Sequence, residues 1–429
     1  MSNLPFGFGP PGDDEGDRPT GGTDPFAGLF GAGANPADLG AALHQFADLM
    51  SYSGGPVNWD LARQTALTSA GAADPGTTAA ESAEVAEAVR LADLWLDPVT
   101  ALPSGISAAE AWSRRRWVEA TLPMWTELCD PVAAKVVDAM SGALPEEMAA
   151  LAGPLGGVMR QVGGMMFGGQ VGSAIGSLAA EVVSSTDIGL PLGPAGRAAL
   201  LPANVTAYGA GLEVPADEVR LFLALREAAH HRLFGHVHWL RGHLVELVHG
   251  FARGITIDGN ALQSIMSDVD PSDPESLQRA LAGGMFEPEQ TDEQRVALGR
   301  LETALALVEG WVDEVVASAA AGSLPNAAAL RETVRRRRAS GGPAEQTFAT
   351  LVGLELRPRR LRDAAALWRS LLETRGSGGR DAVWAHPDLL PTADDLDDPA
   401  AFGTTVPLDL SALPDSGPEE EDRERGEAP

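Results

Sequence analysis

The segment LREAAHHRLFGHVHWLRGHL, residues 225–244, is the stretch of this 429-residue chain that most narrowly limits its fold. It continues a run of helical spacing that begins near Ala216, in which apolar residues recur every three or four positions as far as Phe234. Most long segments between the two ends of the chain have the same spacing, and strand-like alternation is scarce. The sequence therefore predicts a mainly α fold with few or short strands.

A cluster of histidines marks this segment as the place to look for chemistry. Six of the eight histidines fall within twenty residues: His230, His231, His236, His238, His243 and His249. Residues 226–230 form an H-E-x-x-H pattern with arginine in the first histidine position. In the intact pattern, two histidines one helical turn apart bind one zinc ion, and the glutamate polarises the attacking water.

Arg226 changes what this pattern can do. A guanidinium cannot lose its proton to bind zinc, and its positive charge repels the cation. Arg226, Glu227 and His230 also share an arc of the predicted helix with two apolar residues, so burial of that face would require polar partners. Two interpretations remain open here: a zinc site that has lost one ligand, or a buried Arg, Glu and His network that fixes helix packing.

A second predicted helix, over about residues 291–321, could supply the missing partners. Glu302, Glu309 and Asp313 border its apolar stripe. Glu309 and Asp313 lie one turn apart, so both could be directed at the polar face of the first helix if the two helices pack together. The alternative is that these acids face solvent in i,i+4 patterns.

Three blocks together resemble an actinobacterial zincin-like family of zinc-dependent metalloproteases or hydrolases: residues 225–244, LVEGWVDEVV at 307–316, and RRRRASGGPAEQTFATLVGLELRPRRLRDAAALW at 335–368. The resemblance covers roughly residues 40 to 400. It implies a zincin-like helical fold and zinc-dependent hydrolysis of peptide bonds. By this resemblance Glu227 matches the general base, His230 the second histidine ligand and Glu309 a third ligand, whereas Arg226 departs from the first ligand.

A substitute for the missing ligand would have to come from the neighbouring histidines. His231 is rotated by about 100° from His230 on a helix, which makes it a poor substitute. His236 follows His230 by six residues, the offset at which metzincins present a third histidine, but the accompanying glycine would be expected at Leu233 and not at Gly235. His236 is therefore a weaker candidate zinc ligand.

The leading functional hypothesis is a zinc-dependent metallopeptidase or hydrolase that acts on a peptide or protein and has a degenerate motif at Arg226. Glu302 and Asp313 are expected beside Arg226 around its cleft. The alternative is a non-catalytic zincin-fold binding or scaffold protein, in which Arg226 pairs with Glu227 or Glu309 where zinc would bind.

Composition divides the chain into five regions. A Gly/Pro/Asp-rich tail over residues 1–36 and an acidic tail over 400–429 are predicted to be disordered. Between them we expect an N-terminal helical region over 37–150, a glycine-rich packed segment with a connection over 151–204, and the zincin-like helical region over 205–399. Within the first helical region, Pro123 is expected to divide a long helix.

Gln161 to Ala180 is the one candidate for a membrane span, because its twenty residues carry no charge. Glycine recurs every four residues through it, at Gly164, Gly168, Gly172 and Gly176. Glycine disfavours an isolated helix, but such a face lets another backbone approach closely. We therefore predict a packed helix and no stable membrane insertion.

Charge and cysteine content limit the classes of partner. The 60 acidic residues exceed the 31 basic ones, for a net charge of −29, which disfavours nucleic acid as a partner. The arginine run at 335–338 is expected to pair with the chain's own acids. Cys129 is the single cysteine, and the first residues resemble no secretory signal, so we predict a cytoplasmic protein. The oligomeric state stays open.

Overall fold

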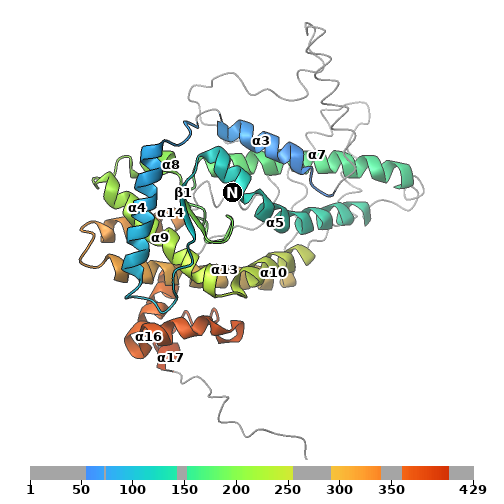
Figure 1. Ribbon diagram of the computed structural model, residues 1–429. Helices are drawn as coiled ribbons and strands as arrows, with labels where there is room; N and C mark the ends of the chain where they lie inside the picture. The colour runs from blue at the N-terminus through green and yellow to red at the C-terminus, as the bar shows by residue number, and fades with distance from the viewer. Residues whose placement is uncertain (1–54, 72–73, 143–151, 255–290, 340–359, 405–429) are drawn as a thin grey trace, which may run out of the picture.

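A computed structural model of the protein describes residues 55–71, 74–142, 152–254, 291–339 and 360–404 (Figure 1). The predicted tail over residues 1–36 lies outside these ranges, as does the predicted acidic tail apart from residues 400–404.

The described residues form a mainly α structure with two short strands, as the sequence predicts. The helices are α3 (Trp59–Gly71), α4 (Ala79–Leu96), α5 (Arg114–Gly142), α7 (Ala152–Ala179), α8 (Pro202–Gly209), α9 (Ala216–His236), α10 (Leu240–Arg253), α13 (Asp292–Ala320), α14 (Ala327–Ala339), α16 (Leu361–Asp381) and α17 (Pro399–Thr404), with 3-10 turns at Ala382–Ala385 and Pro387–Leu389. The strands are β1 (Ala108–Ala111) and β2 (Arg197–Leu200).

The two strands pair in parallel, with Ala108 opposite Arg197 and Ala111 opposite Leu200. On the other side of β2, Ser184 forms an antiparallel bridge to Leu200. The segment that follows α7 is thereby fixed next to β2, which in turn packs on α9. This arrangement brings the chain around residues 183–187 to the side of the helix that carries the histidine cluster.

The glycine-rich helix α7 packs along α3, and Figure 1 shows the two side by side. A Cβ atom on Gly168 would lie 2.5 Å from the carbonyl oxygen of Asn58, and one on Gly172 would lie 2.4 Å from that of Ala62. Both distances are too short for any side chain, so glycine is required for this approach. Among the described helices, none is both long and apolar enough to cross a membrane.

Helix α5 corrects one expectation. It runs continuously for 29 residues through Pro123 and Pro131, so the predicted division at Pro123 is wrong. A proline has no N–H to donate to the carbonyl four residues earlier, which for Pro131 is that of Glu127. His249 of α10 bonds that carbonyl through Nε2 at 3.1 Å. A tertiary contact thus replaces the helical bond that Pro131 cannot make.

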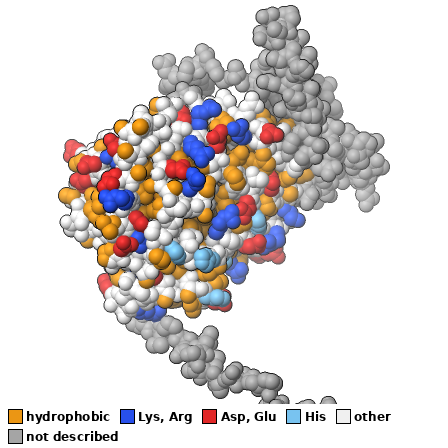
Figure 2. Space-filling view, in the orientation of Figure 1, with side chains coloured by type: hydrophobic (Ala, Val, Ile, Leu, Met, Phe, Trp, Pro, Cys, Tyr) orange, Lys and Arg blue, Asp and Glu red, His pale blue; other side chains and the backbone are white. Residues whose placement is uncertain are grey.

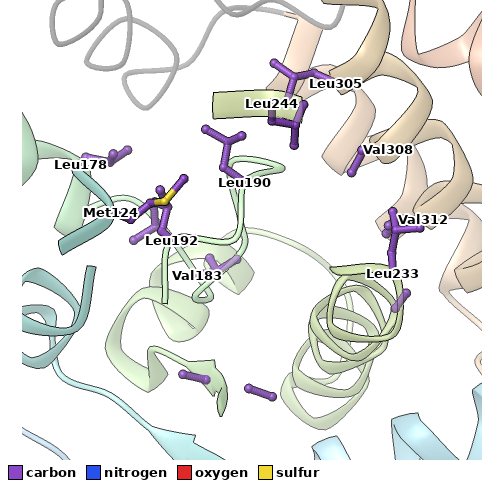
Figure 3. Close-up of a cluster of buried hydrophobic side chains, with 14 of the residues drawn as sticks. Met124, Leu178, Val183, Leu190, Leu192, Leu233, Leu244, Leu305, Val308 and Val312 are labelled. Carbon is purple, nitrogen blue, oxygen red and sulfur yellow. The ribbon is translucent and has the colours of Figure 1, made fainter. Parts of the chain in front are cut away.

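The buried apolar side chains of the described helices join into one core (Figure 3). Trp112, Trp117 and Trp125 are buried within it. Gly310 lets α16 approach α13 closely, since a Cβ atom there would lie 2.6 Å from that of Ala364. The Glu-Gly-Trp block of α13 therefore serves packing as well as the site described next.

Candidate functional site

Helix α9 is buried on every side over residues 222–233. Five polar side chains lie inside that stretch: Arg226, Glu227, His230, His231 and Arg232. A buried polar group without a hydrogen-bond partner costs free energy, so each needs a partner from the surrounding elements. Arg232, for example, bonds Asp93, Asp97 and a backbone carbonyl, which ties α9 to α4.

Arg226 and His230 both contact Glu309 of α13. The Arg226 Nη2 atom donates to Glu309 Oε2 at 2.6 Å, and His230 Nε2 lies 3.2 Å from Glu309 Oε1. All three side chains are almost fully buried. The predicted packing of the two helices through these polar faces is thus confirmed, and the guanidinium lies directly against the carboxylate.

The imidazole of His230 has a defined orientation. Its Nδ1 lies 2.9 Å from the backbone carbonyl of Arg226, and because a carbonyl only accepts, Nδ1 is the donor. The ring also stacks on Phe234 at a centroid distance of 6.2 Å. Nε2 is consequently the atom that faces the carboxylate of Glu309.

Glu309 has a second cationic partner that the sequence did not identify. Arg338 of α14 donates from Nη2 to Glu309 Oε1 at 3.1 Å and is itself buried. Burial acts to raise the pKa of Glu309, but Arg338, Arg226 and the contact with His230 together hold it far below its usual range. The carboxylate is therefore ionised and balanced by buried guanidinium groups.

Glu227 points to a different side of α9. Its Oε1 accepts from Ser185 Oγ at 2.5 Å and from the backbone N–H of Ala199 at 2.9 Å, and its Oε2 accepts from both the hydroxyl and the N–H of Thr186. His231 Nε2 lies 3.2 Å from Oε1. Burial acts to raise the pKa of Glu227, but His231, Ser185 and Thr186 together lower it to about 2.

The arc that the sequence assigns to Arg226, Glu227 and His230 is thus divided between two sites. Arg226 and His230 face α13, whereas Glu227 and His231 face β2 and the segment before it. The side chains of adjacent residues on a helix point about 100° apart around its axis. Because other elements pack on both sides of α9, this angle directs Arg226 and Glu227 to different elements. Ser185 and Thr186, which hold Glu227, carry no recognisable sequence signal.

The other predicted site residues lie elsewhere. Asp313 is bound by Arg331 and Arg335 of α14. Glu302 is half-buried on α13, about 10 Å along the helix axis from Glu309. His236, at the end of α9, bonds the backbone carbonyl of Ser104 at 3.1 Å.

The arginine run at the end of α14 pairs with the chain's own acids, as predicted. Its four members contact Asp313, Glu332, Asp187 and Glu309 in turn. Figure 2 shows the same mixing of basic and acidic side chains over one face of the molecule. Arg338, the last of the run, is the member that reaches the buried site.

The segment between α7 and β2 covers both carboxylates. Gly189 has φ of +78°, and a Cβ atom there would lie 2.8 Å from Glu309 Oε1, so only glycine fits. Asp187 of the same segment contacts Arg337 and Arg338. Exposure of Glu227, His230 and Glu309 is 0%, 1% and 1%, so water reaches little of either site.

The donor set does not fit a catalytic zinc ion, which needs three protein ligands and an open position. His230 Nε2 and Glu309 provide two, and the place of the first histidine holds the guanidinium of Arg226. Within the described ranges, no group of three or more His, Cys, Asp or Glu side chains could hold a metal ion. A guanidinium has no lone pair to offer a metal.

Comparison with known proteins places the chain in a family. No curated protein matches it. A crystal structure from Chloroflexus aurantiacus, provisionally described as that of a hydrolase with a novel fold, aligns with a TM-score of 0.55 and 20% identity over 81% of this chain and 97% of that one. At this identity the likeness extends to the fold. The sequence matches the zincin-like metallopeptidase family over residues 57–402, and the chain belongs to that family.

Proposed function

We propose that this chain is a non-catalytic member of the family, a binding or scaffold protein in which Arg226 takes the place of the metal as the cationic partner of Glu309. The observation that carries the proposal is the buried ion pair between Arg226 Nη2 and Glu309 Oε2, at 2.6 Å. A second guanidinium, that of Arg338, balances the same carboxylate. The negative charge of Glu309 is therefore balanced by two arginines of the same chain.

The environment of Glu227 supports the same proposal. A general base needs a lone pair directed at the proton that it removes. Both oxygens of Glu227 accept hydrogen bonds from Ser185, Thr186 and the Ala199 backbone, and the side chain is fully buried. Its pKa of about 2 also makes it a weak base at neutral pH.

A zinc-dependent metallopeptidase or hydrolase is the second candidate, and one distance favours it. His230 Nε2 and Glu309 Oε1 lie 3.2 Å apart, and two ligands of a tetrahedral zinc are about 3.3 Å apart. This candidate needs a third ligand in place of Arg226. His236 would have to leave Ser104 to provide one.

The proposed partner is a peptide or protein, and the proposed location is the cytoplasm. The partner is proposed from the family, whose members are described as metallopeptidases. The location is proposed from the single, buried Cys129, which fits a reducing compartment.

The test is to rebuild the missing ligand. Arg226→His places an imidazole one helical turn before His230, and we expect this variant to bind close to one zinc per chain. Arg226→Gln removes the same charge without supplying a ligand, and it should gain little or no zinc. The zinc content of each variant, measured after purification without an affinity tag, decides between the two candidate functions. Equal zinc in both variants and in the unmodified protein would contradict the proposal.

A further inference from the structure

Arginine side chains gather where α13, α14 and α16 meet. Five of them, from α14 and α16, form what we call the arginine face: Arg331, Arg335, Arg336, Arg362 and Arg369. We propose that this face binds the acidic C-terminal segment of the same chain, residues 419–424. The proposal goes beyond the proposed function, because it does not depend on whether Arg226 or a metal ion pairs with Glu309.

The arginine face carries more positive than negative charge. Among the described residues, its five arginines form ion pairs with three carboxylates, those of Asp313, Glu314 and Glu332. Glu373 follows Arg369 by one helical turn, and counting it still leaves one arginine in excess. This local excess contrasts with the net charge of −29 of the whole chain.

The arginines lie above the acids that they contact. The side chains of Asp313 and Glu314 are 2% and 7% exposed, whereas those of Arg336, Arg362 and Arg369 are 77%, 64% and 47% exposed. Each of these three arginines contacts its carboxylate through a single nitrogen atom. A guanidinium has five N–H donors, so most of them remain directed at solvent and can bind a further carboxylate.

Charge complementarity favours the C-terminal segment as the occupant. Residues 419–424, EEEDRE, contain five acidic residues and one arginine. A carboxylate binds a guanidinium with two parallel hydrogen bonds, which suits exposed arginines that still have free donors. A row of carboxylates can therefore contact several arginines of the face at once.

The chain also enters this segment from a point beside the arginine face. Helix α17 packs on α16 and ends at Thr404 (Figure 1). A Cβ atom on Gly403 would lie 2.7 Å from the hydroxyl oxygen of Ser370, the residue that follows Arg369. The last described residues of the chain are thus next to one of the arginines of the face.

The intervening length of chain is sufficient. About 15 residues separate Thr404 from Glu419, and an extended chain of that length spans up to about 50 Å. Arg362 and Arg369 are about 10 Å apart along the axis of α16. A tether of this kind raises the local concentration of the acidic segment to roughly the millimolar range, which favours it over an acidic segment of a separate protein.

Fluorescence anisotropy of a label on the C-terminal segment tests the proposal in the full chain. Ser416→Cys provides the attachment site, because Cys129, the single cysteine, is buried. Salt weakens surface ion pairs, since the Debye length falls from about 10 Å at 0.1 M to about 3 Å at 1 M. We therefore expect the anisotropy of the label to be high below 0.1 M salt and to fall as the salt approaches 1 M.

The double variant Arg362→Gln with Arg369→Gln should abolish this dependence on salt. The label should then have the low anisotropy of the high-salt state at every salt concentration. The two substitutions leave no carboxylate unpaired, because Glu332 keeps a contact with Arg336 and Glu314 keeps one with Arg331. The thermal midpoint of the double variant should accordingly stay close to that of the unmodified protein.

A control and a second variant make the result specific. The control, Arg63→Gln with Arg90→Gln, makes the same charge change on α3 and α4, where the two side chains are 51% and 65% exposed. It should behave like the unmodified chain. The second variant neutralises the segment without altering any described residue, and it should reproduce the effect of the Arg362 and Arg369 substitutions: Glu419→Gln, Glu420→Gln, Glu421→Gln and Asp422→Asn.

Four results would overturn the proposal. Equal anisotropy in the Arg362 and Arg369 variant and in the control would show that the segment does not use this face. Equal anisotropy in the neutralised and unmodified segments would show that charge does not hold it. Anisotropy that rises with protein concentration would identify a second copy of the chain as the binding site. Low anisotropy at low salt in the unmodified chain would leave the face to a separate acidic partner.

Discussion

Glu227 and Glu309 are both buried, ionised carboxylates that contact α9, yet their partners differ in kind. Glu227 is held by short neutral donors and one histidine: two hydroxyls, two backbone N–H groups and His231. Glu309 is held by the guanidinium groups of Arg226 and Arg338 and by His230. The first carboxylate depends on many modest contacts, and the second on a balance between buried charges.

The difference shows two ways in which this chain keeps a buried carboxylate ionised. A metal site needs its cation to compensate the ligating carboxylate. In this chain two buried arginines supply that charge, so Glu309 can stay ionised and buried. The contacts of Glu227 include no guanidinium: hydroxyl and backbone N–H dipoles make most of them, and His231 makes the remaining one. The two carboxylates should therefore respond differently to substitution.

The largest effect is expected for Glu309→Gln. It leaves Arg226 buried without the carboxylate that it bonds and removes one of the carboxylates that contact Arg338. Removal of one partner of a buried ion pair costs about 3–5 kcal/mol. Glu227→Gln leaves no buried guanidinium without a partner and should cost about 1–3 kcal/mol in the free energy of unfolding. Denaturant unfolding of the two variants measures both. Equal losses, or a smaller loss for Glu309→Gln, would contradict the distinction between the two sites.

Acid should destabilise the protein partly through Glu227. Its pKa is lowered from 4.5 to about 2 in the folded state, so below pH 4.5 the unfolded chain takes up a proton that the folded chain does not. The stability that Glu227 contributes, about 3 kcal/mol at neutral pH, is present above pH 4.5 and is lost as the pH falls towards 2.

Unfolding experiments between pH 4.5 and 2 can isolate the contribution of Glu227 to the pH dependence of stability. Glu227→Gln has no proton to gain at this position, so its free energy of unfolding should fall less steeply between pH 4.5 and 2 than that of the unmodified protein. Parallel acid profiles would show that Glu227 does not titrate as its contacts imply.

The smallest effect is expected for Ser185→Ala. It removes one of the donors to Glu227 and leaves those of Thr186, Ala199 and His231 in place. A single hydrogen bond to a charged group that keeps other donors should cost about 1 kcal/mol in the free energy of unfolding. A loss similar to that of Glu227→Gln would mean that this one hydroxyl dominates the site.

Local pattern predicted much of this arrangement. Helical spacing predicted α9 and α13, and the four-residue glycine repeat predicted a close helix contact. The position of Glu309 at the border of the apolar stripe of α13 predicted its contact with Arg226 and His230. Each of these follows from periodicity along one helix.

Contacts between segments that are distant in the sequence could not be predicted from periodicity. Ser185 and Thr186 contact Glu227 from 42 and 41 residues away in the sequence, and Arg338 contacts Glu309 from 29 residues away. Short polar loop residues carry no periodicity that would reveal such a contact. Pro131 in α5 was likewise hidden, because its tolerance depends on His249 from another helix.

The most direct test of the role of Arg226 is the zinc content of the unmodified protein. Purified without an affinity tag and measured by elemental analysis, it should contain far less than one zinc per chain, because a guanidinium already pairs with Glu309 at 2.6 Å. Close to one zinc per chain, lost on His230→Ala but unaffected by Arg226→Gln, would contradict this and would show that another residue completes a metal site.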